Sequence, residues 1–397
     1  MNFPALLFIF VLHSSLTPSS VDANEFDQCS RYDPNALEKA RHGNWPDFCF
    51  ETIAVQLNAT NPRRASLLAS YNCFRNLGPL SSLGSLSRFY EFTWLEPHGA
   101  DPKTKLYRRK MALESLRRES DVVWLEAQRP YILPEDEFPK EGVQDGVSYI
   151  CESQDKVLAE SGRWEPTKLQ LPWDDPKWDM KQFGHWNLKD SDMRVDKAWE
   201  KEGVSGHGIT VAIADTGLDC NSPELKKNCD RDLSWDFVDN DDDLTEKTEH
   251  GTMMAGLVAM EAGNRECGVG VAYNARIAGI RILEKRKAIA DATYARALSH
   301  QLDKIHIYSC SFSLHTTLAP LQKKALAEAA KEGRNGKGTI YLFASGNNGA
   351  SFSCSAGAYT TSIYTIAITS VNYKNLHPAY AEECPAVMAS AYRVFQN

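Results

Sequence analysis

The sequence predicts an α/β protein, in which a mostly parallel sheet with helices on both faces follows a small α+β region. Two observations lead to this prediction. From Gly206 onward, strand-like and helix-like segments alternate, which is typical of βαβ units. In addition, the run Ile209–Ala214 is continuously apolar and rich in β-branched residues, as in a strand that is buried on both faces.

The segments after Gly206 can be assigned in order from their patterns. His250–Met260 is mostly small and apolar, which predicts a buried helix, and Gly333 predicts the end of a later helix. We expect strands at 209–214, 275–283, 305–312, 339–344 and 362–371, and helices at 250–260, 288–302 and 318–331.

The part before Gly206 divides into further regions. Residues 1–23 are expected to be a signal peptide, because the apolar run Phe3–Leu12 is too short to span a bilayer and Val21-Asp22-Ala23 offers a cleavage site. Residues 24–134 carry mixed patterns and many basic side chains. Residues 135–170 are rich in Glu, Asp, Pro and Gly, which predicts a linker or insertion before a main domain at 171–397.

Composition limits the classes of function. The net charge of -8 argues against a nucleic-acid-binding protein, which would usually carry a basic face. No later stretch is long and apolar enough for a membrane helix. We therefore expect a soluble protein of the secretory pathway or the extracellular space.

Ten cysteines in a secreted chain predict disulfides, and Cys220 and Cys229 are near enough in sequence to close a small loop. The sequon Asn58-Ala59-Thr60 predicts a glycan at Asn58, although many sequons stay unused.

Three polar motifs fall at the ends of the expected elements. Asp215 ends the strand in Ala214-Asp215-Thr216-Gly217, His250 opens a helix in His250-Gly251-Thr252, and Asn347 follows a strand in Ser345-Gly346-Asn347. A serine hydrolase needs a base, a carboxylate that orients the base, and a donor for the oxyanion. Each motif alone is weak, but the three together, on these elements and in this order, predict such a site.

These motifs resemble those of the subtilisin-like serine proteases, and in particular the kexin/furin proprotein convertase family. The stretches that are similar to that family lie between about Phe50 and Tyr392, both in the main domain and in a convertase-like prodomain at 24–134. They are Asn76–Gly78, Phe89–Phe92, Trp124–Glu126, Cys267–Ile277, Ile305–Ser309 and Ser362–Thr365.

The resemblance implies a role for each site residue. Asp215 would orient His250, His250 would be the general base and then the general acid, and Asn347 would donate to the oxyanion. The substrates would be polypeptides or proproteins, the chain's own prodomain would be a partner, and Cys354 would pair with Cys384. A structural calcium would use the positions Asp175, Glu224 and Asn264, with backbone carbonyls near Glu261, Glu266 and Gly268. From sequence alone, ordinary surface polar residues are about as good an explanation of that set.

The sequence departs from the family at the nucleophile. The family's serine lies in a Gly-Thr-Ser-Ala motif, and the chain contains no such motif. Ser390, in Met388-Ala389-Ser390-Ala391, lacks the preceding Gly-Thr, and its surroundings match a family strand that precedes the nucleophile. We therefore expect that the last catalytic helix is missing from this sequence and that Cys267 loses its family partner.

Specificity and maturation also depart from the family. Thr216, Lys247 and Gly357 stand where the family carries acidic residues that read Arg and Lys, and Ser311–Pro320 contains no acid. Each lost charge-assisted contact would cost about 1.5–3 kcal/mol. After Trp124–Glu126 the chain has one Arg followed by Pro instead of a polybasic self-cleavage site.

Three hypotheses follow from these departures. The chain can be a serine endopeptidase seen in an incomplete form, or a catalytically inactive relative that binds substrates, propeptides or partner proteases. It can also be a subtilase with altered, apolar specificity.

Overall fold

The computed structural model describes residues 50–95, 99–128, 130–131, 193, 195–245, 248–266, 268–285, 287, 289–314, 316–372 and 375–392. They form two compact units. The first comprises the described residues up to Pro79 and from Arg88 to Tyr131, and the second comprises Leu80–Ser87 and the described residues after Tyr131. The expected signal peptide, the whole of the expected linker and Asp175 lie outside the described residues.

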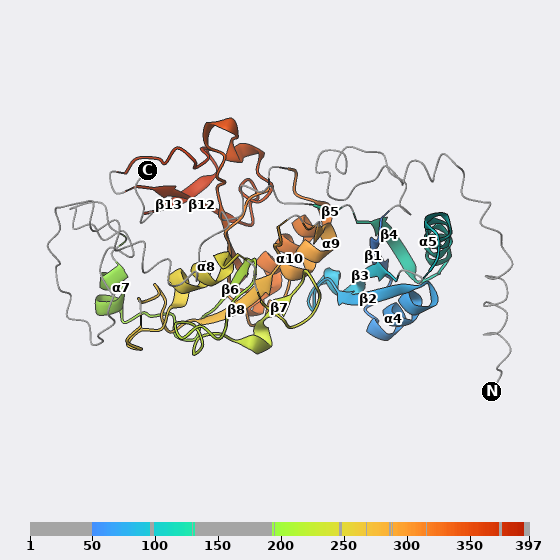
Figure 1. Cartoon of the computed structure of the whole chain (residues 1–397), viewed down its shortest axis with the longest axis horizontal. Coiled ribbons are helices and arrows are strands. Elements are labelled where there is room, and N and C mark those ends of the chain that lie inside the picture. Colours follow the sequence, from blue (N-terminus) through green and yellow to red (C-terminus); the bar gives the residue numbers. More distant parts are fainter. Residues whose placement is uncertain are drawn as a thin grey trace. The chain divides into compact units, whose positions relative to one another are not determined.

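The first unit is a four-stranded antiparallel sheet with two helices, and the strand order is β2-β3-β1-β4. Asn61 and Asp101 cap the two helices through side-chain oxygens, and each helix begins with a proline. Its elements are β1 (Thr52–Leu57), α4 (Pro62–Tyr71), β2 (Phe74–Pro79), β3 (Phe89–Trp94), α5 (Pro102–Arg117), β4 (Val122–Ala127) and β5 (Pro130–Tyr131) (Figure 1). Between β2 and β3 the chain forms η3 (Ser85–Arg88), whose first three residues belong to the second unit.

The second unit contains a seven-stranded parallel sheet in the order β13-β12-β11-β10-β6-β8-β7. Its elements are α7 (Val195–Glu202), β6 (Thr210–Asp215), η6 (Arg231–Leu233), β7 (Trp235–Asp236), α8 (His250–Ala259), β8 (Arg276–Arg281), β9 (Ile289–Ala290), α9 (Asp291–Ala297), β10 (Ile307–Cys310), α10 (Pro320–Gly336), β11 (Ile340–Ala344), η7 (Gly349–Ser351), η8 (Cys354–Ala356), β12 (Ile366–Val371) and β13 (Val387–Tyr392) (Figure 1). The predicted α/β class with a mostly parallel sheet is confirmed.

One face of this sheet is covered by the turn that follows α9. Tyr308 of β10 lies in register with Tyr341 of β11 and with Ala212 of β6, so the three side chains share a face. The Tyr308 hydroxyl donates to the His300 carbonyl at 2.5 Å, and the Tyr341 hydroxyl donates to the Leu298 carbonyl. Burial raises the pKa of both phenols, which therefore stay neutral.

The opposite face of the sheet is covered by α8. Val211 and Ile213 of β6 alternate with the residues of the first face, and they belong to one buried cluster with Ala255 and Ala259 of α8. The small residues that suggested a buried helix are thus the residues that let α8 approach the sheet.

Several expected elements are longer than the observed ones, although α10 runs past the expected end of its helix at residue 331. The helix expected at 288–302 is shortened to α9 and a turn, and the strand expected at 305–312 is shortened to β10. Apolar residues beyond the ends of these elements are buried in loops. The apolar pattern in the sequence is therefore longer than the hydrogen-bonded helix or strand that it predicts. The regular helical conformation of α10 breaks at Gly333, as expected.

Candidate active site

Asp215 is the last residue of β6 and is completely buried. Its Oδ1 atom lies 2.7 Å from Nδ1 of His250 and also accepts the backbone N–H of Thr216 at 2.8 Å. His250 is the first residue of α8, and its side chain is 19% exposed. The structure thus brings together the two residues that the sequence singled out as carboxylate and base.

Two threonines hold the start of α8 against the loop that follows β6. Thr216 Oγ1 accepts the N–H of Gly251 at 3.2 Å, and Thr252 Oγ1 accepts the N–H of Asp219 at 2.8 Å. Both threonines are buried. Sequence reasoning missed this pair of contacts, although each threonine lies within two residues of a catalytic candidate.

Asn347 lies three residues beyond β11 and is exposed. The next residue, Asn348, donates to the carboxylate of Glu382 from its backbone N–H at 3.3 Å and from its side-chain amide at 3.1 Å. Glu382 is completely buried and was not predicted. Glu382 helps to hold the turn that carries Asn347. In the sequence, the only nearby feature that could have drawn attention to Glu382 is Cys384, two positions later.

Ser390 lies within β13, in register with Thr369 of β12. Three strands separate β13 from β6, so four strand spacings of roughly 4.8 Å place Ser390 about 19 Å away from the strand of Asp215. Ser390 is thus separated from the strand of Asp215 by β10, β11 and β12.

The segments that leave β10 and β11 pass over an aromatic cluster. Phe312 contacts Phe343 and Tyr359 edge to face at centroid distances of 5.5 and 5.8 Å, and Phe343 stacks on Tyr359 at 4.1 Å. The N–H of Ala358 donates to the carbonyl of Leu314 at 2.8 Å. Carboxylates are absent from the described part of Ser311–Pro320, which is all of it except position 315.

Gly357 is buried beside this cluster. A Cβ atom at this position would lie 2.3 Å from Thr360 Oγ1, so the acidic side chain that the family resemblance places here would require Thr360 to move. Lys247, the other substitution noted before His250, lies outside the described residues.

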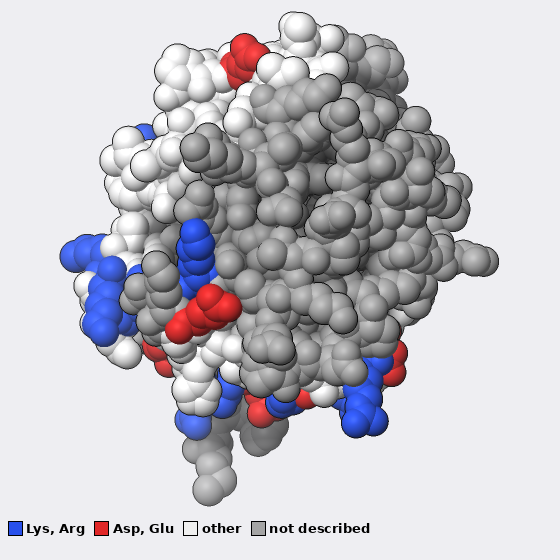
Figure 2. Space-filling model, turned by 90° about the vertical axis from the view of Figure 1, so that its left-hand side faces the viewer, with Lys and Arg blue, Asp and Glu red and all other residues white. Residues whose placement is uncertain are grey.

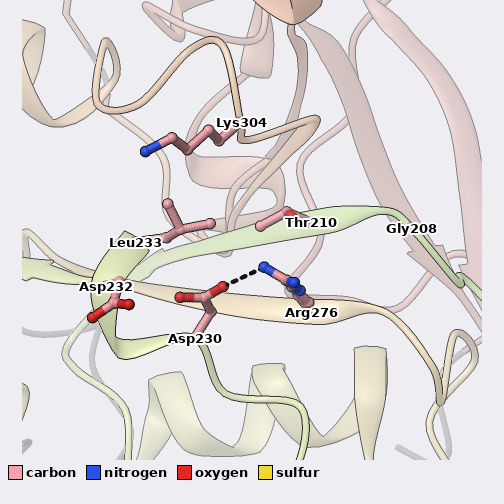
Figure 3. A pocket seen from close by; sticks show the side chains of 7 residues that line it. All are labelled: Gly208, Thr210, Asp230, Asp232, Leu233, Arg276 and Lys304. Carbon is pink, nitrogen blue, oxygen red and sulfur yellow. Dashed lines mark hydrogen bonds and ion pairs between the residues drawn. The ribbon is translucent and has the colours of Figure 1, made fainter.

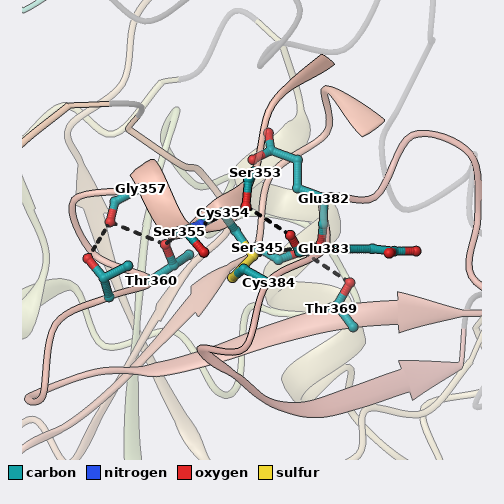
Figure 4. The surroundings of a disulfide bond; sticks show 11 residues. Ser345, Ser353, Cys354, Ser355, Gly357, Thr360, Thr369, Glu382, Glu383 and Cys384 are labelled. Atoms are coloured by element: carbon teal, nitrogen blue, oxygen red, sulfur yellow. Dashed lines mark hydrogen bonds between the residues drawn. A yellow bond between two sulfur atoms is a disulfide. The ribbon is translucent and has the colours of Figure 1, made fainter. Parts of the chain in front are cut away.

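Two disulfides stabilise the loops around the sheet. Cys220 pairs with Cys229, and Cys354 pairs with Cys384, as the sequence suggested. Figure 4 shows that the second bond ties η8 to the segment before β13, next to the bond from Ser353 Oγ to the Glu383 carbonyl. Cys267 lies outside the described residues.

Part of the predicted calcium set is brought together. Glu224 is buried, and its carboxylate accepts from the Asn264 amide at 3.1 Å and from the Gly268 N–H at 3.4 Å. The Glu224 carbonyl accepts the Glu261 N–H at 2.9 Å, and Asn264 Oδ1 accepts the Glu266 N–H at 3.0 Å. The structure thus brings Glu224 and Asn264 into contact, but the printed bonds of their side-chain oxygens go to protein N–H groups. The described residues contain no group of three His, Cys, Asp or Glu side chains that could hold a metal.

A polar pocket of about 390 Å³ lies at the N-terminal ends of β6 and β8, the opposite end of these strands from Asp215 (Figure 3). It is lined by the first residues of β6 and β8, Thr210 and Arg276, and Arg276 pairs with Asp230 at 2.8 Å. Thr210 and Asp215 are the two ends of β6, roughly 16 Å apart. The pocket is therefore distinct from the Asp215–His250 pair.

The described surface carries charges of both signs. Figure 2 shows basic and acidic side chains close to one another along the lower edge of one face, and neither sign covers the described part of that face alone. Among the helices of the described residues, none is both long and apolar enough to cross a membrane.

Comparison with known proteins gives consistent results. The model of the Subtilase family matches residues 206–393. The chain is 36% identical to Endoprotease bli-4 of Caenorhabditis elegans over 74% of this chain and 33% of that protein, and 43% identical to Kexin of Saccharomyces cerevisiae over 51% and 26%. It is 34% identical to mouse Furin over 83% and 38%. The chain thus spans well under half the length of these relatives.

Solved structures share the fold at lower identity. The epidermin leader peptide processing serine protease of Staphylococcus aureus superposes with a TM-score of 0.52 at 14% identity, over 86% of this chain and 75% of that one. A serine protease of Aeromonas sobria superposes with a TM-score of 0.50 at 19% identity, over 59% and 46%.

Proposed function

The chain is a member of the subtilase family, similar to the kexin- and furin-type proprotein convertases, and on this premise we propose that it is the prodomain and part of the peptidase domain of a secretory-pathway serine endopeptidase. The observation that supports this most directly is the 2.7 Å contact between Asp215 Oδ1 and His250 Nδ1. The substrates would be polypeptides, and residues 24–134 would be the prodomain partner.

In the proposed reaction, Asp215 accepts the Nδ1–H of His250, so that Nε2 is the ring nitrogen that takes a proton. His250 removes the proton of an attacking hydroxyl and later returns it to the leaving amine. The Asn347 amide donates to the oxyanion, and loss of such a donor typically lowers turnover by about 10²–10³. The nucleophilic serine is absent from this sequence, so residues 1–397 alone should not hydrolyse peptides.

A hydrolysis assay tests this proposal. Recombinant chain is incubated with fluorogenic peptides, and its rate is compared with that of the His250→Ala variant. We expect equal, background rates. Turnover that disappears in His250→Ala would contradict the proposal that the sequence lacks its nucleophile. Full-length transcripts that continue into a Gly-Thr-Ser-Ala motif would support the peptidase assignment.

The second candidate function is that of an inactive relative that binds substrates, propeptides or partner proteases. The packing of Gly357 against Thr360 favours it, because this loss of an acidic position lies within the sequence and is independent of any missing serine. Transcripts that end at the codon for Asn397 would support this candidate, and binding of basic propeptides to the purified chain would then be the measurement to make.

If the protein is an active peptidase, we propose an apolar rather than a dibasic preference. No carboxylate stands at Gly357 or Thr216, and none lies in the described part of Ser311–Pro320, so the charges that would read a dibasic substrate are absent from these positions. Self-cleavage after Arg129 is disfavoured by the following proline and by Gln128, which is buried and bonded to Thr52.

Three further features belong to the same proposal. Calcium would be held by Glu224 and Asn264 with carbonyls near Glu261, Glu266 and Gly268, and would stabilise the loop after α8. Asn58 is exposed directly after β1, so a glycan could be attached there in a secreted protein. The first 23 residues would be removed as a signal peptide.

A further inference from the structure

The chain that follows β6 runs from the candidate site to the beginning of β8. Asp215 is the last residue of β6, and Cys220 follows five positions later. Further along, Cys229 pairs with Ile277 of β8 through an isolated parallel bridge. Because Cys220 and Cys229 form a disulfide, a residue close to the Asp215–His250 pair is linked covalently to a residue that is paired with β8.

The Cys229 end of the disulfide is held by hydrogen bonds on both sides. The N–H of Ile277 donates to the Asn228 carbonyl, and the N–H of Asp230 donates to the Ile277 carbonyl, both at 2.8 Å. The side-chain amide of Asn228, which is buried, donates to the carbonyl of Ala259 at 2.9 Å. Ala259 is the last residue of α8, so this end of the disulfide is fixed to both β8 and α8.

The Cys220 end of the disulfide lies on the α8 side of the sheet. Cys220 is 4% exposed and belongs to the same buried cluster as Ala255 of α8. The residue before it, Asp219, donates its N–H to Thr252 Oγ1 at 2.8 Å. Thr252 lies in the first turn of α8, two positions after His250. The disulfide is therefore one residue away from the bond that holds the start of α8 against the loop.

We propose that the Cys220–Cys229 disulfide positions the Asp215–His250 pair. The bond fixes Cys220 and its neighbour to β8. Without it, the loop between the two cysteines can open locally while the sheet stays folded, and the first turn of α8 loses the contact through Thr252. The inference rests on the proposed function only in treating the pair as catalytic, because it concerns how the base is held and not the nucleophile.

Nuclear magnetic resonance of the purified full chain tests the proposal without any turnover. The ring ¹⁵N shifts of neutral His250 give the share of the Nδ1–H tautomer, which the contact with Asp215 favours. We expect this tautomer to predominate in wild type and its share to fall in the double variant Cys220→Ala, Cys229→Ala. Hydrogen exchange at the Asp219 amide should become at least about tenfold faster in the same variant.

The second disulfide of the same unit provides the matched control. The double variant Cys354→Ala, Cys384→Ala also removes one cross-link, but this cross-link lies beside β13 and not beside α8. It should leave the His250 tautomer and the Asp219 exchange rate as in wild type. The proposal is wrong if removal of Cys220–Cys229 leaves both readouts unchanged, or if the two double variants change them equally.

Wild type alone gives an independent test in case the first variant does not fold. If the disulfide fixes the loop to the core, the Asp219 amide should exchange as slowly as the amides of β6, because both open only when the sheet opens. Faster exchange at Asp219 would overturn the proposal. Neither measurement depends on peptide hydrolysis, so the proposed function stands or falls separately.

Discussion

The centre of the seven-stranded sheet and its β12–β13 side are built differently. All six residues of β6 are buried, and Tyr341 and Phe343 of β11 are at most 1% exposed. By contrast, three consecutive residues of β13 are exposed, and Met388 is 70% exposed. The Asp215–His250 pair therefore lies on the part of the sheet that is packed on both faces, whereas the strands after Asn347 lack such cover among the described residues.

The difference indicates where a functional site could be lost without loss of the fold. Asp215 is held by strand pairing on both sides of β6, and His250 by the helix that covers it. Asn347 depends on a turn that is held by Glu382 from the segment before β13. The position of His250 is therefore fixed by the packed centre of the sheet. The position of Asn347 depends on the β12–β13 side, which is less covered.

The largest expected effect on stability is seen by comparing a substitution of an aromatic residue in the centre of the sheet with one of an apolar residue in β13. Phe343→Ala should lower the free energy of unfolding by about 4 kcal/mol, because it leaves a cavity between Phe312 and Tyr359. Met388→Ala should change it by less than about 0.5 kcal/mol. Urea unfolding followed by near-ultraviolet circular dichroism measures both, and equal losses would show that β13 is covered in solution.

A second prediction uses pH to weaken the centre selectively. Burial lowers the pKa of His300 to about 4, and the positive charges of Arg296 and Lys304 act in the same direction. In the unfolded chain, the pKa of His300 is about 6.5. Between pH 6.5 and pH 4, His300 therefore binds a proton in the unfolded chain but not in the folded chain. Stability should therefore fall by about 3 kcal/mol as the pH is lowered through this range.

The matched variant for this prediction is His300→Asn, which keeps a polar amide near the position of Nδ1 and does not titrate. Its unfolding free energy should fall less steeply than that of wild type between pH 6.5 and 4. Parallel curves for the two proteins would exclude His300 as the source of the acid sensitivity.

Much of the fold, and the Asp215–His250 pair of the candidate site, could be predicted from the sequence. Strands that are buried on both faces, such as Ile209–Ala214, carry a continuous apolar signal, and the residue after such a strand reaches the edge where sites form. Glu382 could not be predicted, because it meets Asn348 from 34 positions away and leaves no periodic pattern. The ties made by Thr216 and Thr252 were missed for a related reason, since a hydroxyl has many possible partners within reach.

The smallest expected effect concerns one of these ties. Thr252 is 5% exposed, and its hydroxyl accepts the N–H of Asp219 at 2.8 Å. Thr252→Val removes this acceptor and leaves the N–H without it, which should cost about 1 kcal/mol of unfolding free energy and speed hydrogen exchange at the Asp219 amide. Thr252→Ser keeps the hydroxyl and should preserve the protection of that amide. If both variants exchange at the wild-type rate, packing against β6 alone positions α8, and the polar tie adds nothing to the stability of the centre.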